Sequence, residues 1–385
     1  MAYNGSKAGP NGYVLATPSR SPYLELRDYL RHGEQRPRED ERSREDERSR
    51  GDEQPVYYFE NGRAYQVFCK ERYMLPCDEE EMDRMDIFHR FFQVAREHDT
   101  PFASLHQLPL PAQPRILDLG CGTGIWAIDM ADRYNSSGVV AAEVIGWDLA
   151  LIQPQRIPPG LMFEKRDVED MPWRGVNRDY FDLIHVQMLL GSIGNWPALY
   201  SQILRHLKPG SGILEQVEID LRPRCEKGEL PGNTKLSLWI RELSEAFDRA
   251  GAPLGMDPKT QAVLEDVGFV DVKQETKRVP CNAWPDDEHE KDMGRWFNLA
   301  LTQGLQAMSY GPLTRKLHYN KDQVDALVAE VRREICDRNI RAYCIYGLHG
   351  DPLRGGNDPK PPSMLIFASM PFNSQLLRQL LLHRS

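Results

Sequence analysis

An acidic residue followed by three glycines at alternate positions is the most informative feature of the sequence. Asp118 lies two residues before Gly120, and Gly122 and Gly124 follow at the same spacing. Glycine is needed where the backbone adopts a positive φ or where a ligand approaches it closely. A loop that binds a dinucleotide pyrophosphate would read G-x-G-x-x-G. The spacing G-x-G-x-G and the preceding acid favour a ligand with a cationic amine and no phosphate, such as S-adenosylmethionine (SAM).

Polar and thioether side chains at the ends of later predicted strands extend this candidate site. Asp148 ends the second strand, where a carboxylate can accept from both ribose hydroxyls, although it could instead cap a helix. Asp167 follows the third strand and can accept from the adenine amine, unless it is a loop acid that faces water. Gln187 and Met188 follow the fourth strand and are expected near the methyl group, unless they only pack the loop. The predicted cofactor-binding residues are Asp118, Gly120, Cys121, Gly122, Gly124, Asp148, Leu149, Asp167, Val168 and Gln187.

Other side chains that could do chemistry show no matching pattern. His185 lies in a predicted strand and is interpreted as a core histidine whose hydrogen bonds are satisfied. Large aromatic residues are usually core residues, so no tryptophan is assigned to the site. The seven cysteines include no Cys-x-x-Cys pair and the histidines form no H-E-x-x-H motif. The sequence therefore predicts no metal site.

Strands and helices alternate from residue 116 onward. This alternation predicts an α/β fold, Rossmann-like, with a doubly wound and mostly parallel sheet that is covered by helices on both faces. In such sheets the ligand binds beyond the carboxyl ends of the strands, where the candidate residues lie. The predicted strands are 116–119, 139–147, 161–165, 181–186 and 213–219, and the helices among them are 126–134 and 196–207.

The sequence also predicts a division into three parts. Residues 1–55 contain two tandem copies of Arg-Glu-Asp-Glu-Arg-Ser and few apolar residues, which predicts a disordered, mixed-charge arm. Residues 56–348 are expected to form one SAM-binding domain, and residues 349–385 a C-terminal tail. The last strand is expected at 342–348 or at 364–369.

Helices outside the alternating region are expected to contribute to this domain. Apolar residues recur at helical spacing from residue 78 to residue 98, and Asp78 can cap that helix. At least two more helices, around 293–308 and 322–339, are expected within a helical cap at about 284–341. This insertion between late strands could cover the ligand pocket.

Charge and composition limit the classes of function. The chain has 385 residues, a formal net charge of -9 and a pI near 5.7. An acidic chain of this kind is not expected to bind DNA directly. No apolar run has the length of a membrane span, and the N-terminus lacks the pattern of a secretory signal. The expected compartment is therefore the cytosol or the nucleus.

These motifs resemble those of known methyltransferases. Asp118 to Gly124 resembles motif I of class I SAM-dependent methyltransferases, and Leu207-Lys-Pro-Gly210 resembles a later motif of the same superfamily. Across about residues 57–345 the chain resembles, more narrowly, the LaeA family, a fungal group of methyltransferase-like regulators of secondary metabolism. The segments that carry this likeness are 73–81, 86–89, 122–129, 153–154, 182–185, 215–220, 223–225, 294–296 and 298–299.

The resemblance implies SAM binding and methylation of the protein's own methionine. Met188 matches the family's methionine after the fourth strand, with Gln187 beside it as the second catalytic candidate. The resemblance also implies a nuclear protein that acts with velvet-domain partners on secondary metabolism and sporulation. Two alternatives stay open at this point: a biosynthetic enzyme that methylates a fungal metabolite, and a scaffold that binds SAM without catalysis.

A methionine acceptor is chemically consistent with the residues near the site. A thioether is a neutral nucleophile, so methyl transfer to it needs no general base. The rate would then depend mostly on holding the sulfur in line with the methyl group, which is a proximity effect. The sequence shows no obvious catalytic base near the predicted pocket, in agreement with this chemistry.

Overall fold

The computed structural model describes residues 57–96, 110–135, 142–226, 228, 230, 232–255, 257–273, 276–347 and 366–369. The predicted N-terminal arm, residues 1–55, lies outside this part of the chain. Most of the predicted C-terminal tail also lies outside it.

A seven-stranded sheet in the order β5-β4-β3-β6-β7-β12-β9 forms one half of the described structure. The five strands from β5 to β7 are all parallel, whereas β12 runs antiparallel to both of its neighbours. The order reverses between β3 and β6, which confirms the predicted doubly wound α/β fold. The strands are β3 (Arg115–Leu119), β4 (Glu143–Asp148), β5 (Leu161–Lys165), β6 (Leu183–Gln187), β7 (Ile213–Val217), β9 (Val270–Lys273) and β12 (Ile366–Ser369).

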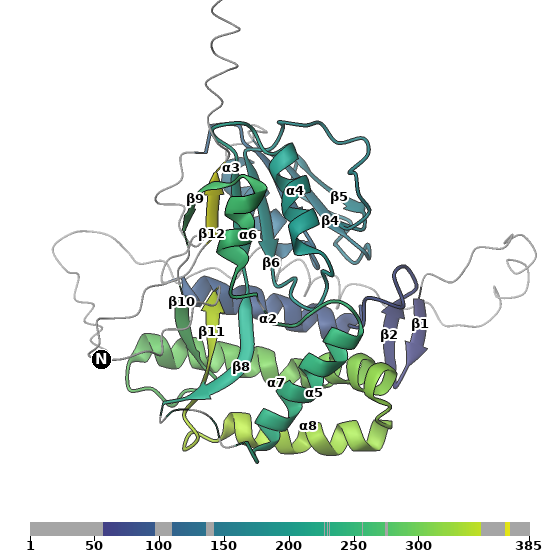
Figure 1. Cartoon of the computed structure of the whole chain (residues 1–385), viewed down its shortest axis with the longest axis vertical. Coiled ribbons are helices and arrows are strands. Elements are labelled where there is room, and N and C mark those ends of the chain that lie inside the picture. Colours follow the sequence, from purple (N-terminus) through teal and green to yellow (C-terminus); the bar gives the residue numbers. More distant parts are fainter. Residues whose placement is uncertain are drawn as a thin grey trace, which may run out of the picture. The chain divides into compact units, whose positions relative to one another are not determined.

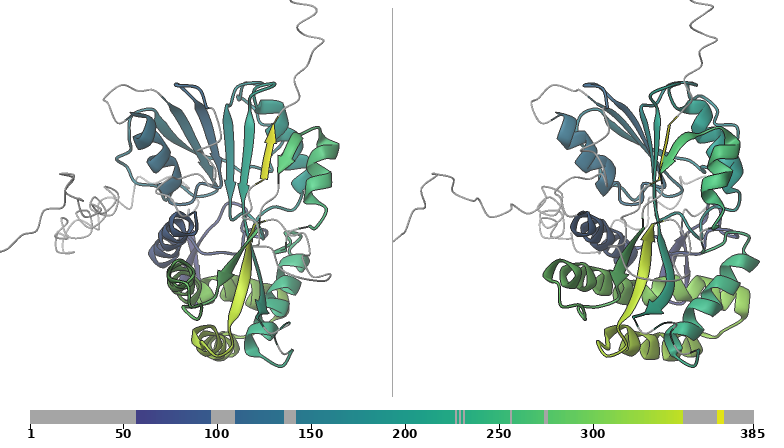
Figure 2. Two further views of the ribbon diagram at one scale, coloured as in Figure 1. Left: turned by 90° about the vertical axis from the view of Figure 1, so that its left-hand side faces the viewer. Right: turned by 60° about the vertical axis from the view of Figure 1, so that its left-hand side comes forward.

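Helices cover both faces of this sheet because successive strand residues point to opposite sides. Leu117, Leu119 and Ile184 pack in one core cluster with residues of α4 (Trp196–His206) and α6 (Thr260–Val267). The opposite face, which carries Asp118 and His185, lies against α3 (Ile125–Asn135). Figure 2 shows the sheet nearly edge-on between these helices.

The C-terminal boundary predicted at residue 348 is wrong. β12 lies beyond it and pairs with β7 through Ile366↔Gln216 and Ser369↔Ile213. Both alternatives for the last strand form strands, since β11 (Ala342–Gly347) belongs to a second sheet. A strand of four residues has little sequence signal of its own, because pairing with β7 and β9 rather than local propensity stabilises it.

A second layer, the cap, lies at the carboxyl ends of the parallel strands (Figure 1). It is larger than the predicted region 284–341, which supplies only two of its helices. The cap also takes elements from before and after the parallel strands. Its elements are α2 (Glu79–Ala95), β8 (Ile219–Cys225), α5 (Lys235–Arg249), β10 (Thr276–Pro280), α7 (Glu288–Leu317), α8 (Lys321–Cys336) and β11, with the sheet order β10-β11-β8.

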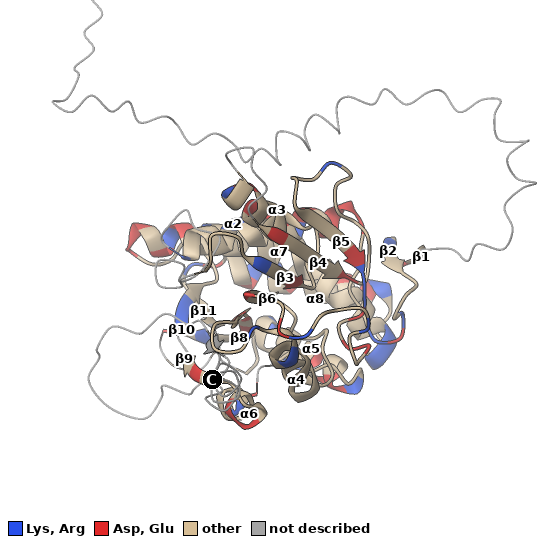
Figure 3. Ribbon diagram, turned by 90° about the horizontal axis from the view of Figure 1, so that it is seen from above, with Lys and Arg blue, Asp and Glu red and all other residues tan. Residues whose placement is uncertain are grey.

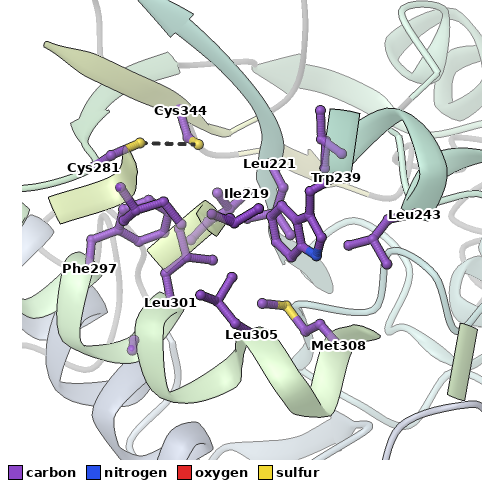
Figure 4. Packing of buried hydrophobic residues seen from close by; sticks show 14 of the residues in the cluster. Ile219, Leu221, Trp239, Leu243, Cys281, Phe297, Leu301, Leu305, Met308 and Cys344 are labelled. Atoms are coloured by element: carbon purple, nitrogen blue, oxygen red, sulfur yellow. Dashed lines mark hydrogen bonds between the residues drawn. The ribbon is translucent and has the colours of Figure 1, made fainter. Parts of the chain in front are cut away.

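The cap has its own apolar core, shown in Figure 4. Four buried residues of α7 at helical spacing face β8 and α5, and the indole N–H of Trp239 donates to Ser309 Oγ at 2.8 Å. Cys281, directly after β10, lies beside Cys344 of β11, with 3.9 Å between their sulfur atoms. The α7 residues are Phe297, Leu301, Leu305 and Met308.

Two short elements precede the cap helix α2. The strands β1 (Tyr57–Glu60) and β2 (Arg63–Gln66) form an antiparallel hairpin. As predicted, Asp78 caps α2, because its carboxylate accepts from the N–H of Glu81 at 3.1 Å. Within the described ranges, no helix is both long enough and apolar enough to cross a membrane.

Candidate active site

The glycine loop connects β3 to α3 and takes the backbone shape that the sequence predicts. Gly120, Gly122 and Gly124 have φ values of 69°, 54° and 77°. The N–H groups of Gly120 and Cys121 both donate to the carbonyl of Trp147, at 2.8 and 3.0 Å. A Cβ atom on Gly120 would lie 2.4 Å from the Leu189 side chain. The loop therefore requires glycine for its positive φ and for this close approach.

One pocket lies between this loop and the cap. It brings together every predicted site residue except Gly124, which completes the turn by donating its N–H to the Cys121 carbonyl at 2.8 Å. The predicted residues that line the pocket are Asp118, Gly120, Cys121, Gly122, Asp148, Leu149, Asp167, Val168, Gln187 and Met188. Their roles stay predictions, but their convergence on one pocket is a property of the structure.

Asp118 is the most unusual charged group in the pocket. The residue is only 3% exposed, and within the described residues no cation or hydrogen-bond donor reaches the carboxylate. Burial, together with the nearby charges of Asp148 and Glu215, raises the pKa of Asp118 well above its ordinary value. A ligand ammonium would relieve this cost, since a buried charge needs an opposite partner.

Asp148 binds the glycine loop and stays close to the pocket. Its carboxylate accepts from the N–H of Gly122 at 2.8 Å and from the N–H of Ala150 at 3.0 Å. Burial raises its pKa to about 6 despite these hydrogen bonds. No helix follows it between residues 149 and 160, so the helix-cap alternative is wrong. Each carboxylate oxygen keeps lone-pair capacity for a ribose hydroxyl.

Asp167 pairs with side chains of the segment before α2, which no pattern in the sequence connects with it. Its carboxylate pairs with the guanidinium of Arg72 and accepts from Cys69 Sγ at 3.3 Å and from the N–H of Glu169 at 2.9 Å. Burial alone would raise the pKa of Asp167, but these hydrogen bonds and the Arg72 charge lower it below the ordinary value. Asp167 is therefore not a loop acid facing water, and an adenine amine would share a carboxylate already paired with Arg72.

Gln187 and Met188 lie at the carboxyl end of β6, on the side of the pocket nearest the cap. Gln187 Oε1 accepts from the Arg96 guanidinium at 3.2 Å. Met188 has φ of 58°, and its N–H donates to the Val217 carbonyl at 2.9 Å. Its half-buried side chain packs against the apolar core of the cap. Met188 therefore belongs both to the pocket lining and to the edge of the cap.

The interpretation of His185 as a satisfied core histidine is only half right. The residue is fully buried, and its Nδ1 lies 2.8 Å from a carboxylate oxygen of Glu215. Its Nε2, however, has no partner among the described residues, although His185 lines the pocket. Asp118, His185 and Glu215 are paired in register on β3, β6 and β7, and Trp126 stacks on the imidazole with 3.7 Å between ring centroids.

The cap supplies pocket residues that sequence reasoning missed. They come from α2 and from the segment before it, where the apolar spacing predicts a helix but not what the helix faces. Only His89 has a side-chain type that could have drawn attention to this helix in the sequence. Its Nε2 lies 2.8 Å from a carboxylate oxygen of Asp129 on α3. The missed lining residues include Arg72, Tyr73, Met85, Phe88, His89 and Phe92.

Among the residues that the structure describes, no group of three or more His, Cys, Asp or Glu side chains could hold a metal ion. The polar groups of the pocket instead suit an organic cation. An unpaired carboxylate and an unpartnered imidazole nitrogen lie on adjacent strands, next to a loop with glycines at its turns.

Comparisons with known proteins identify the family. The model of a methyltransferase domain matches residues 89–254. The "Secondary metabolism regulator LAE1" of Cochliobolus heterostrophus is 50% identical over 292 residues, which cover 74% of this chain and 91% of that protein. The chain belongs to the LaeA family. The family resemblance predicted from the motifs is thus confirmed.

Two further comparisons differ in strength. The "Protein-methionine methyltransferase laeA" of Emericella nidulans is 40% identical over 294 residues, covering 76% of this chain and 75% of that protein. The crystal structure of the YcgJ protein of Bacillus subtilis covers 69% of this chain and 96% of that protein at 14% identity. The TM-score of this comparison is 0.37.

This LaeA-family chain is a SAM-dependent methyltransferase, and its pocket fits that cofactor. Asp118 can hold the ammonium group, the unpartnered Nε2 of His185 offers a second acceptor beside it, and Asp148 can accept from the ribose. When bound, the cofactor supplies an electrophilic methyl group on a sulfonium.

Proposed function

We propose that this LaeA-family methyltransferase transfers a methyl group to its own Met188. The observation that carries the proposal is the position of Met188, which lines the cofactor pocket directly after Gln187. The next residue, Leu189, touches the glycine loop at Gly120. A methionine in this place would lie next to the bound cofactor, so that no separate acceptor molecule would have to enter the pocket.

The chemistry balances without a proton transfer. A lone pair of Met188 Sδ forms the bond to the methyl carbon, while the bond from that carbon to the cofactor sulfur breaks and leaves its electron pair there. Met188 becomes a methylsulfonium, and the cofactor leaves as a neutral thioether. No group has to act as a general base, so the imidazoles of His185 and His89 are not required for proton transfer.

The chain contributes position and a dry environment to this step. Phe88, Phe92 and Trp126 are buried and line the pocket, so that they exclude water from its interior. Fixing two reacting atoms in line can be worth effective molarities of about 10⁵ M or more. This effect is the main source of rate enhancement that the geometry offers.

We also propose that the protein regulates secondary metabolite gene expression in the nucleus, in a complex with velvet-domain proteins. Support comes from the family, because the relatives in Cochliobolus heterostrophus and Aspergillus flavus are named secondary metabolism regulators. Figure 3 shows acidic and basic residues on the same helices and strands. Together with the net charge of -9, this supports contact with chromatin through partners rather than through direct DNA binding.

Self-labelling with methyl-labelled SAM tests the acceptor. The Met188→Leu variant keeps a similar volume but has no sulfur, so we expect it to bind SAM and to lose the label. Met162→Leu is the matched control, because Met162 is exposed on β5 and does not line the pocket. Full labelling of Met188→Leu would contradict the assignment. Label in an added fungal metabolite, with none in the protein, would favour the biosynthetic alternative.

A further inference from the structure

Glu218 occupies the junction at which the parallel sheet continues into the cap. It is the single residue between β7, which ends at Val217, and β8, which begins at Ile219. The residue is 1% exposed, and within the described residues no lysine, arginine or histidine forms an ion pair with it. A buried carboxylate without a cation is costly, so its contacts need an explanation.

The carboxylate binds the loop that carries Met188. Glu218 Oε1 accepts from the N–H of Leu189 at 3.1 Å, and Oε2 accepts from the N–H of Leu190 at 3.3 Å. The preceding N–H, that of Met188, donates to the Val217 carbonyl at 2.9 Å. Two consecutive residues at the sheet–cap junction therefore hold three consecutive N–H groups of the loop.

The loop needs such support because of its backbone shape. Met188 has φ of 58°, a left-handed conformation that residues other than glycine adopt at a cost. The turn continues with the N–H of Ser192 donating to the Leu189 carbonyl at 3.0 Å. Within this turn, the N–H of Gly191 donates to the Pro253 carbonyl at 2.9 Å. Without acceptors for its N–H groups, this segment would have unsatisfied backbone donors in a buried place.

The same loop contacts the cofactor side of the pocket. Leu189 Cδ2 lies 2.4 Å from the position that a Cβ atom on Gly120 would take, so its side chain fits closely over the glycine loop. A shift of the Leu189 backbone would change its contact with Gly120. The same shift would displace Met188, which is the preceding residue. Glu218 thus controls a loop that has the proposed acceptor on one residue and a cofactor-loop contact on the next.

We propose that Glu218 is a positioning residue for methyl transfer: it fixes the backbone of residues 188–190 so that the Met188 sulfur faces the cofactor. The proposal rests on the proposed self-methylation of Met188. Glu218 takes no part in bond making or breaking. Its two carboxylate oxygens are needed together, because each accepts from a different N–H group.

The test uses Glu218→Gln, which keeps the size of the side chain. The amide has one acceptor oxygen, and its NH₂ group would oppose the second N–H of the loop. Glu242→Gln is the matched control, since Glu242 lies on α5, and its carboxylate accepts from Tyr319 at 3.3 Å, away from the pocket. Three quantities are measured: the Kd for SAM by calorimetry, the single-turnover rate of self-labelling, and hydrogen exchange at the amides of Leu189 and Leu190.

We expect Glu218→Gln to bind SAM within about twofold of the wild type and to label itself roughly ten- to a hundredfold more slowly, because small misplacements of reacting groups cost rates of this order. Exchange at Leu189 and Leu190 should become faster. An unchanged labelling rate would overturn the proposal, as would a loss of SAM affinity as large as the loss of rate. A wild type that does not label itself refutes the proposed function, whereas a labelled wild type with an unimpaired variant refutes only the role of Glu218.

Discussion

At the scale of single residues, the pocket contains buried carboxylates, and their charge destabilises the folded protein when no cofactor is bound. Asp118 is a buried carboxylate that no cation of the described residues reaches, and burial also raises the pKa of Asp148 to about 6. At the junction between sheet and cap, outside the pocket lining, burial raises the pKa of Glu218 to about 8. A carboxyl group whose pKa is raised by folding stabilises the fold while it is protonated. That contribution is lost as the pH rises from about 4 towards the folded-state pKa.

Asp118→Asn should therefore stabilise the cofactor-free protein and weaken SAM binding. Asparagine has the shape of the protonated acid but no charge to bury, so the gain in Tm over the wild type should be small at about pH 5 and larger at about pH 8. SAM should raise the Tm of the wild type and have much less effect on the variant. Thermal unfolding with and without SAM measures both quantities. A variant that is less stable than the wild type at the higher pH would contradict the account of Asp118.

At the scale of elements, the long helix α7 connects most parts of the cap. Gly311 lies where α7 passes the segment before α2, and a Cβ atom there would lie 2.1 Å from the Met74 carbonyl oxygen. Backbone atoms cannot yield as a flexible side chain can. The close approach of these two segments, which brings Tyr73 and Leu75 to the pocket, therefore depends on glycine at this position.

Gly311→Ala should destabilise the protein by about 1–3 kcal/mol, the usual cost of added volume in a packed region. Urea unfolding measures the change. Gly232→Ala is the control, because nothing lies within 4 Å of a Cβ atom there and its φ is not positive. Equal stability of the two variants would contradict the packing that the structure shows between α7 and Met74.

The parallel core could be predicted from the sequence because each of its elements has a local signal. The glycine loop and the strand from residue 116 are visible in a few consecutive residues. In the cap, the helix that Asp78 caps has a local signal of the same kind. The pairing of β12 with β7 and that of Arg72 with Asp167 were not predictable, since they depend on contacts across 95 or more residues of chain. The unpartnered Nε2 of His185 also depends on what surrounds the ring, which spacing does not reveal.

At the scale of the whole described domain, the pocket lies between the parallel sheet and the cap, and the chain joins the two layers more than once. β7 continues through Glu218 into β8, and α2 packs on α7 while His89 contacts Asp129 of α3. Cofactor residues therefore come from the sheet, and acceptor-side residues come from both layers. This arrangement explains why the predicted cofactor residues converge, whereas the cap residues of the pocket were missed.

The proposed partnership is a property of the whole chain and is tested in the native fungus. Affinity purification of the tagged protein from nuclear extracts should recover velvet-domain proteins, and the Met162→Leu control should recover them equally well. Recovery of the tagged protein from the cytosol alone, without velvet-domain proteins, would contradict the proposed nuclear complex. The methyltransferase activity would then have to serve a role outside such a complex.

The position of the methyl group is the most direct test of the central claim. Purified full-length protein is incubated with SAM, digested, and analysed by mass spectrometry of the peptide that contains residues 185–191. The account predicts one added methyl group on this peptide, assigned by fragmentation to Met188, and a rate independent of protein concentration because the transfer is intramolecular. A methyl group at another residue, or none in a protein that binds SAM by calorimetry, would contradict it.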